Sequence, residues 1–234
     1  MKTINRNKII LTIGSFCFLL AALLSVVHFV SFDYKFYDSE HSKIQIYGKS
    51  VSEHIGISDD DLKELTRFTL DYLNDADASL DKKLNIKGEL REVFTDDEKL
   101  HMVDVRELNL NSLKVDYICI IIFVLILLYF LIYIKDINLL FSSYKYALIF
   151  FLIIFGFLAI WIFYDFDSFW TCFHQLFFSG NELWLLDLDT DVLIMIVPPE
   201  FFNDLVIKIV ICFIISIIVP YLVLFFICRR KLND

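Results

Sequence analysis

Four long apolar runs divide the chain, and polar stretches separate them. The runs cover residues 9–30, 115–134, 146–163 and 205–228. A transmembrane helix needs about 17 to 25 predominantly apolar residues. The pattern therefore predicts an α-helical polytopic membrane protein with four transmembrane helices.

The first apolar run raises the alternative of a cleaved signal peptide. The apolar region of a signal peptide is shorter, roughly 7 to 15 residues, and a small-x-small cleavage site follows it. Here the run ends in the sequence VVHFVSFD, which has no such site. We therefore expect residues 9–30 to form an uncleaved first transmembrane helix.

Basic residues cluster at three ends of the apolar runs. They lie in the tail 1–8, in the loop 135–145 and in the tail 229–234, which contains Arg229, Arg230 and Lys231. In a chain with four spans these three segments share one side, and short loops rich in Lys and Arg favour the cytoplasm. Segments 31–114 and 164–204 are therefore expected on the extracytoplasmic face.

The extracytoplasmic segment 31–114 is expected to be mainly helical. Ser58, followed by three aspartates, is typical of a helix start. Thr95 and Glu98 have the spacing of a capping box, which marks a second start. The KIQIYG stretch (43–48) alternates like a short strand. We expect a helical cap that includes a few short strands, although the fold of residues 31–88 stays poorly defined.

The second extracytoplasmic segment, 164–204, is expected to contain a short helix that Asp167 or Ser168 caps and that runs through Phe178. Pro199 is well placed in the first turn of the last span. Asp204 and Lys208 are four residues apart, a spacing at which opposite charges pair on a helix.

The composition agrees with a membrane protein and excludes other classes. The chain is 58% hydrophobic with a mean hydropathy of +0.64. Its net charge is −9, and its basic residues form no stripe along the sequence. Nucleic acid is therefore not an expected partner. The five cysteines form no CxxC pair and show no zinc-ligand spacing, and HExxH and GxSxG motifs are absent. Neither a metal site nor a serine nucleophile is predicted.

The stretch 169–202 combines aromatic residues with acids and lacks lysine and arginine. It is too polar to span a bilayer, and its phenylalanines exceed what interfacial anchoring needs. We expect it at the membrane surface, facing acyl chains or a partner protein.

Two of the five histidines stand in amphipathic segments beside a span. Glu98 and Asp104 lie three residues on either side of His101 and share its helical face. His174 shares a face with Trp170 and Phe178. Acid–base work by an imidazole pair is one interpretation, and two structural histidines with satisfied hydrogen bonds is the other.

The remaining histidines carry no expected role. His28 is interfacial, whereas His41 and His54 lie in polar sequence that we expect to be exposed.

The sequence around both histidines resembles the lipoprotein intramolecular transacylase (Lit) family of Gram-positive bacteria. The resemblance rests on four stretches in order: EKLHMVDV (98–105), FHQLFF (173–178) with Asn181 and Trp184, DVLI (191–194) and PEFF (199–202). It covers nearly the whole chain, including the four spans.

This resemblance implies a membrane acyltransferase of the bacterial cell membrane. The family moves an acyl chain within a diacylglyceryl lipoprotein, from the glyceryl ester to the α-amine of the N-terminal cysteine. The two catalytic histidines correspond to His101 and His174, and no cofactor is implied. Expected orienting or substrate-binding residues are Glu98, Asp104, Phe178, Asn181, Trp184, Glu200, Phe201 and Phe202.

Within this reaction His174 is assigned as the base and His101 as the electrophilic partner, with Asp104 or Glu98 orienting His101. The reverse assignment stays open. The expected partners are the lipoprotein substrate and membrane lipids. The oligomeric state is open, and a monomer is compatible with the sequence.

A non-enzymatic accessory protein that binds another membrane protein through its outer segments is the alternative. A transporter is disfavoured, because the only ionisable groups expected in the spans are His28 and Lys208, near the interfaces.

Overall fold

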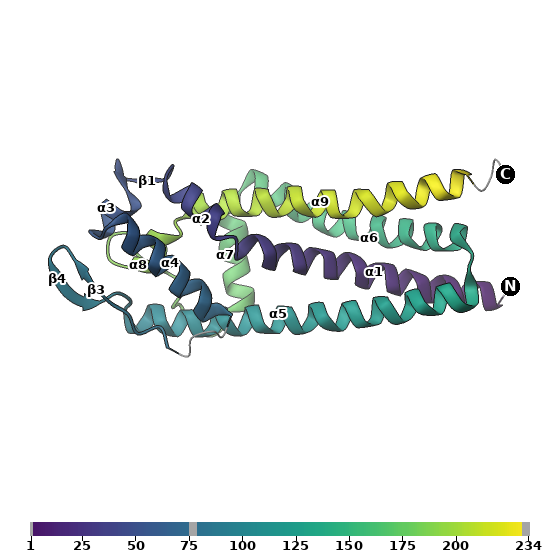
Figure 1. Ribbon diagram of the computed structural model, residues 1–234, viewed down its shortest axis with the longest axis horizontal. Helices are drawn as coiled ribbons and strands as arrows, with labels where there is room; N and C mark the ends of the chain where they lie inside the picture. The colour runs from purple at the N-terminus through teal and green to yellow at the C-terminus, as the bar shows by residue number, and fades with distance from the viewer. Residues whose placement is uncertain (1, 75–78, 231–234) are drawn as a thin grey trace. The chain divides into compact units, whose positions relative to one another are not determined.

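The computed structural model describes residues 2–74 and 79–230. Four of the helices within these ranges are long and apolar enough to cross a membrane. They are α1 (Lys2–Ser31), α5 (Asp96–Tyr129), α6 (Ile137–Tyr164) and α9 (Pro199–Arg230), and a π-helical turn, η1 (Phe130–Ile134), extends α5 (Figure 1). The predicted polytopic helical fold with four transmembrane helices is confirmed.

The chain forms two compact units. One, here called the bundle unit, contains Met1–Val27, Ser112–Phe169 and Ile209–Asp234. The other, here called the hairpin unit, contains His28–Asn111 and Trp170–Lys208.

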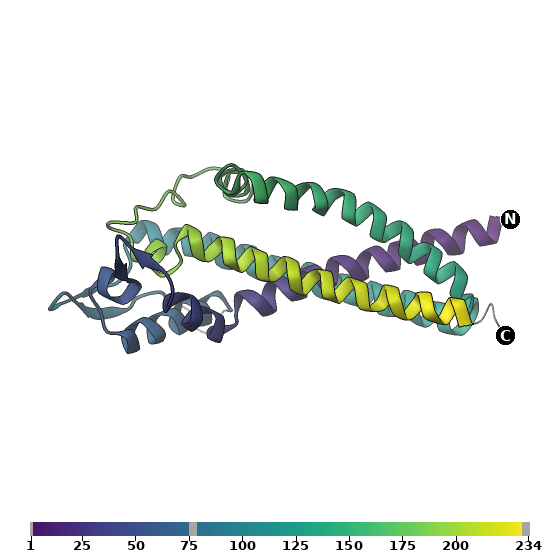
Figure 2. The same cartoon turned by 90° about the horizontal axis from the view of Figure 1, so that it is seen from above.

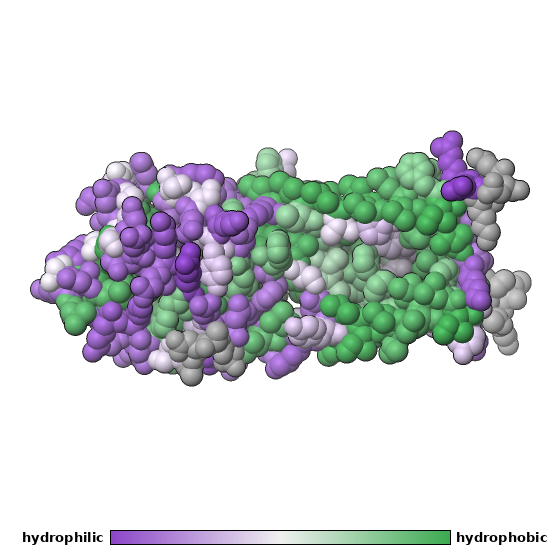
Figure 3. Space-filling model, in the orientation of Figure 1, coloured by the Kyte–Doolittle hydropathy of each residue, from purple (hydrophilic) through white to green (hydrophobic). Residues whose placement is uncertain are grey.

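The core of the bundle unit is apolar and uses aromatic rings to join its helices. Phe151 of α6 lies 5.6 Å from Phe213 of α9 between ring centroids, and the Tyr144 hydroxyl donates to the Ile217 carbonyl at 2.9 Å. Side chains directed outward are also apolar, and the long helices appear as a continuous hydrophobic surface in Figure 3. Because lipid tails are as apolar as leucine, such packing and hydrogen bonds must hold the helices together.

The second span contains a buried acid. Asp116 is 5% exposed, and its Oδ2 accepts a hydrogen bond from the Ser25 hydroxyl at 2.8 Å. The expectation that only His28 and Lys208 bring ionisable groups to the spans was therefore wrong. The hydroxyl partner from α1 offsets part of the cost of burying this carboxyl group, whose other oxygen, Oδ1, is buried without a hydrogen-bond partner.

The three helix ends that carry basic residues lie together in the bundle unit. Figures 1 and 2 show the start of α1, the turn from η1 to α6 and the end of α9 at the same end of the bundle. Arg229 and Arg230 form the last turn of α9, whereas Lys231 lies outside the described residues.

The hairpin unit contains short helices and two antiparallel hairpins. Its short helices are α2 (Tyr34–His41), α3 (Val51–Ile55), α4 (Asp59–Leu73) and α8 (Val192–Ile196), together with most of α7 (Phe166–Phe177). Strand β1 (Gln45–Ile46) pairs with β2 (Lys49–Ser50), and β3 (Lys83–Ile86) pairs with β4 (Glu89–Glu92). Each turn has two residues with positive φ, Tyr47-Gly48 and Lys87-Gly88, which suits a tight two-residue hairpin.

The largest apolar cluster described in the hairpin unit joins helices and strands from both of its chain segments. Leu62 and Leu65 of α4 pack with Ile86 of β3 and with the apolar helix α8, which contributes Val192 and Ile196. This cluster therefore joins residues 31–114 to residues 164–204, although these segments are far apart in sequence.

Several predicted helix boundaries are confirmed and two details are wrong. Ser58 caps α4 in a capping box with Asp61, and α9 begins at Pro199. Asp165, rather than Asp167 or Ser168, accepts the amide at the start of α7. Lys208 pairs with Asp33 at 2.7 Å and not with Asp204, because α2 begins close to this lysine.

Gly14 permits the close packing of α1 against α5. A Cβ atom placed at Gly14 would lie 2.6 Å from Ile126 Cγ2, whereas one at Gly156 would meet nothing within 4 Å. We expect Gly14→Ala to destabilise the protein by about 1 to 3 kcal/mol through overpacking. Gly156→Ala should be neutral or stabilising. It gains the same helix propensity as Gly14→Ala, but its new methyl group meets no neighbouring atom. Thermal unfolding in detergent measures the difference, and equal melting temperatures for the two variants would contradict the prediction.

Candidate active site

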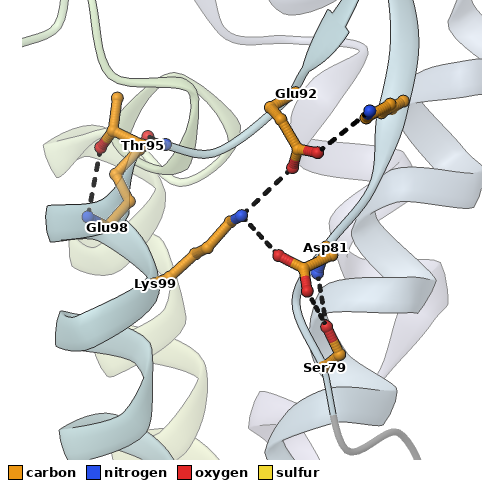
Figure 4. Close-up of polar contacts among 7 residues, drawn as sticks. Ser79, Asp81, Glu92, Thr95, Glu98 and Lys99 are labelled. Carbon is orange, nitrogen blue, oxygen red and sulfur yellow. Dashed lines mark hydrogen bonds and ion pairs between the residues drawn. The ribbon is translucent and has the colours of Figure 1, made fainter.

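The first turn of α5 is fixed by the predicted capping box. The Thr95 amide donates to Glu98 Oε2 at 2.6 Å, and the Glu98 amide donates to Thr95 Oγ1 at 3.2 Å (Figure 4). In the same turn, Lys99 pairs with Asp81 and Glu92 near β3 and β4. His101 follows within the next turn, so its position depends on this helix start.

Glu98 binds backbone rather than an imidazole. Its side chain is 0% exposed, and its second oxygen, Oε1, accepts the Leu193 amide of α8 at 2.7 Å. Burial raises the pKa of Glu98, and the amide donors of Leu193 and Thr95 oppose that shift. Because both oxygens bind amides, Glu98 links α5 to α8 and does not orient His101 as expected.

Helix α7 supplies the second imidazole with a defined tautomer. His174 Nδ1 lies 2.8 Å from the Trp170 carbonyl oxygen. A carbonyl can only accept, so Nδ1 carries the hydrogen. In the neutral ring Nε2 then has a free lone pair, which is the form that a general base needs.

The two imidazoles lie close together in the hairpin unit. Their ring centroids are 6.2 Å apart, and each histidine is 6% exposed. The Phe178 ring lies 5.1 Å from His101 and 5.5 Å from His174, and Trp184 stacks on His174 at 5.0 Å. Aromatic side chains thus enclose a pair of imidazoles from distant parts of the sequence.

Burial keeps both imidazoles uncharged near neutral pH. Burial, with a smaller contribution from His174 and partly offset by Asp104, lowers the pKa of His101 from 6.5 to about 4. Burial also lowers the pKa of His174, while its bond to the Trp170 carbonyl acts in the opposite direction. His101 Nδ1 is buried and has no hydrogen-bond partner.

Asp104 also differs from its expected role. Its Oδ2 accepts a hydrogen bond from Asn181 Nδ2 at 3.0 Å, and no hydrogen bond joins it to His101. It lines a pocket of about 230 Å³ with residues from α5 and from the end of α7 onward, namely Glu107, Leu108, Asn111, Phe177, Phe178, Ser179 and Asn181.

The last three predicted residues, at the start of α9, lie in three different surroundings. The Phe202 ring lies 4.4 Å from the Trp170 ring between centroids. It therefore belongs to the aromatic residues around His174, which Trp170 also contacts. Phe201 is buried against Tyr37 of α2, at 4.6 Å, and Glu200 is exposed at the start of α9. Phe201 therefore supports the fold of the hairpin unit, and the structure does not bring Glu200 to the imidazoles.

Some contributors were missed or misplaced by sequence reasoning. The carbonyl of Trp170 fixes the His174 tautomer, and its position four residues earlier on the helix was the available signal. His41, expected to be exposed, is 8% exposed and bonds the Ile196 carbonyl at 2.8 Å. His54 is also partly buried and bonds the Leu188 carbonyl. Both contacts depend on α8 and its flanks, which no local pattern near either histidine reveals.

The arrangement offers acid–base groups in an enclosed, largely apolar setting. Within residues 2–74 and 79–230, no three His, Cys, Asp or Glu side chains gather closely enough to hold a metal ion. In such a pair, one neutral imidazole can accept a proton from a bound molecule while the other donates a hydrogen bond to it.

Comparison with known proteins identifies a family and a fold. A family model described as "Lipoprotein intramolecular transacylase Lit" matches residues 12–202. The fold is similar to that of the membrane integral lipoprotein intramolecular transacylase Lit from Bacillus cereus, with a TM-score of 0.78, 20% identity and coverage of 98% of this chain and 99% of that chain.

Two further structures of the Bacillus cereus protein, in which a histidine is replaced, match in the same way. The arginine variant gives a TM-score of 0.74 with 19% identity, covering 98% of this chain and 96% of that one. The alanine variant gives 0.75 with 20% identity, covering 98% and 97%. No curated protein sequence matches this chain.

The double role of Glu98 predicts a structural effect of its removal. Glu98→Ala leaves the Thr95 and Leu193 amides without acceptors. The unpaired Leu193 amide is buried and costs about 1 to 3 kcal/mol, whereas Thr95 is exposed and its amide can bind water instead. We expect a clear fall in melting temperature in detergent. Asp97→Ala, which removes the exposed acid one position earlier, is the control and should leave the melting temperature nearly unchanged. Equal melting temperatures for the two variants would refute the structural role of Glu98.

Proposed function

Because this chain belongs to the lipoprotein intramolecular transacylase (Lit) family of membrane acyltransferases, we propose that it forms lyso-lipoproteins with the two imidazoles. The substrate is a lipoprotein whose N-terminal cysteine carries a diacylglyceryl group. One acyl chain moves from a glyceryl ester to the α-amine of that cysteine. The close pair of His101 and His174 is the observation that carries the mechanism.

The reaction balances without a cofactor. The α-ammonium first loses its extra proton through an imidazole to solvent, and the neutral amine attacks the ester carbonyl. As the N–C bond forms, an imidazole takes a second proton from nitrogen. Collapse of the tetrahedral intermediate breaks the C–O bond, and the same proton passes to the departing glyceryl oxygen. The products are an amide and a hydroxyl group.

His174 is the better base of the pair. Its Nδ1–H donates to the Trp170 carbonyl, which leaves Nε2 free and stabilises the positive charge that forms on proton uptake. With a pKa lowered to about 4, His101 holds a proton poorly. This difference supports His174 as the base and His101 as the neutral donor to the developing oxyanion.

Positioning supplies much of the remaining acceleration. The amine and the ester belong to one substrate molecule, so the enzyme must fold that molecule back on itself. Good orientation of two reacting groups can supply about 7 to 11 kcal/mol of the barrier. We propose that apolar walls hold the substrate in this orientation, and that Phe178, Trp184 and Phe202 form them. A flexible polar surface would not hold an acyl chain in one orientation.

The reacting pair is proposed to face the extracytoplasmic side. His101 lies between the first and second spans, and His174 lies between the third and fourth. The basic ends of the helices belong to the opposite side, which the positive-inside rule places in the cytoplasm together with both termini. The protein is thus a multi-pass protein of the bacterial cell membrane with an outward-facing site.

Removal of either imidazole tests the mechanism. We expect His101→Ala and His174→Ala each to reduce conversion by about 10²- to 10⁴-fold, the usual contribution of general acid–base catalysis. Mass spectrometry of lipoprotein N-termini detects the shift of one acyl chain from ester to amide, which leaves the total mass unchanged. His54→Ala, which removes a histidine far from the pair in the sequence, should retain activity. Full conversion by either site variant would remove that residue from the mechanism.

A native cysteine tests the side of the membrane. Cys172 of α7 is exposed, whereas Cys17, Cys119 and Cys228 are buried. A membrane-impermeant maleimide should label Cys172 in intact cells, and Cys172→Ser should abolish that label. Labelling that occurs only after the cells are permeabilised would place the site on the cytoplasmic side instead.

A further inference from the structure

The pocket beside the imidazole pair is polar, unlike the aromatic surroundings of the pair itself. Asp104, Glu107, Asn111, Ser179 and Asn181 contribute polar side chains to its 230 Å³ volume. An acyl chain gains nothing from such a lining, because carboxylates and amides would lose their hydration to it. The pocket therefore suits a polar part of a substrate.

The negative charge of this pocket is not neutralised by the described part of the chain. Neither Asp104 nor Glu107 takes part in an ion pair there. The nearby cations of α5 are engaged elsewhere: Arg106 lies over the Tyr72 ring at 4.5 Å, and Lys99 pairs with Asp81 and Glu92. An unneutralised pair of carboxylates on one helix face attracts a cation.

The pocket shares a wall with the reacting group. Phe178 lines the pocket and also lies 5.1 Å from His101 between ring centroids. His101 is more than nine-tenths buried and its Nδ1 lacks a partner, and Asp104 lies near enough to act on its protonation. A cation held by Asp104 is therefore about one helical turn from His101 along α5.

We propose that Asp104 and Glu107 form a subsite for the α-ammonium of the substrate cysteine. This inference rests on the proposed transacylase function, which needs a free amine placed beside an imidazole. A terminal ammonium carries three donors and one charge, and the α-amino group has a pKa of about 7.7 to 8.0, so it is mostly charged at neutral pH. Asn181 holds the Asp104 carboxylate through Oδ2 and leaves Oδ1 for the ligand.

This subsite also favours release of the product. The acyl transfer converts the ammonium into a neutral amide, which has no charge for the carboxylates to bind. The enzyme then discriminates between its substrate and its product by one charge at one position. Asp104 and Glu107 are thus specificity-determining residues rather than orienting partners of His101.

An unreactive ligand pair tests the subsite without turnover. The first ligand is a dialkylglyceryl-cysteine peptide with ether links, which has no ester to transfer, and the second is its desamino analogue. We expect wild-type protein in nanodiscs at pH 7 to bind the amine ligand about tenfold more tightly, the scale of a hydrogen bond to a charged group. Asp104→Asn with Glu107→Gln should abolish the preference while affinity for the desamino ligand stays unchanged.

The matched control is Glu182→Gln, since Glu182 is an exposed acid beside Asn181 that does not line the pocket. It should keep the tenfold preference. Equal binding of both ligands by wild type, or a preference that survives in the double variant, would overturn the subsite.

A parallel conversion assay with the ester-linked lipopeptide separates the two proposals. Conversion by wild type without any amine preference in binding overturns the subsite alone. An amine preference that depends on Asp104 and Glu107, without conversion, supports the subsite and overturns the proposed reaction.

Discussion

The buried carboxylate of Glu98 is the contact on which the rest of the hairpin unit depends. A carboxylate without solvent is costly to bury unless donors surround it, and here two backbone amides, from Thr95 and Leu193, supply them. The same side chain therefore begins α5 and anchors the start of α8. Since His101 lies one turn beyond this anchor, its position follows from a hydrogen bond that takes no part in the chemistry.

Desolvation then gives two identical side chains different properties. Each imidazole is 6% exposed, and burial is the largest cause that lowers the pKa of both. The Trp170 carbonyl opposes that shift at His174 only, whereas His101 Nδ1 has no partner. In the proposed mechanism this backbone hydrogen bond favours His174 as the base, in the way that paired groups with diverging pKa values divide acid and base roles.

Local sequence patterns predicted the spans and the helix starts, because apolar length and capping boxes are decided by neighbouring residues. The meeting of His101 with His174 came from a family resemblance, since no spacing rule links two helices that the chain connects through two spans. The partners of Asp104, His41 and Lys208 could not be predicted, because each belongs to a distant element. Glu98 shows the limit well: its bond to Thr95 was visible in the sequence, whereas its bond to Leu193 was not.

Phe178 explains how polar and apolar parts of one substrate can meet at this site. Its ring lies near both imidazoles and also lines the polar pocket. An amine that stayed beside carboxylates would remain protonated and unreactive. In the proposed reaction, transfer of its proton to an imidazole frees the amine to attack. A hydrophobic ring shared by the polar pocket and the neutral imidazoles therefore suits the proposed reaction, in which the nucleophile is a cation before it reacts and the electrophile is the ester of a lipid chain.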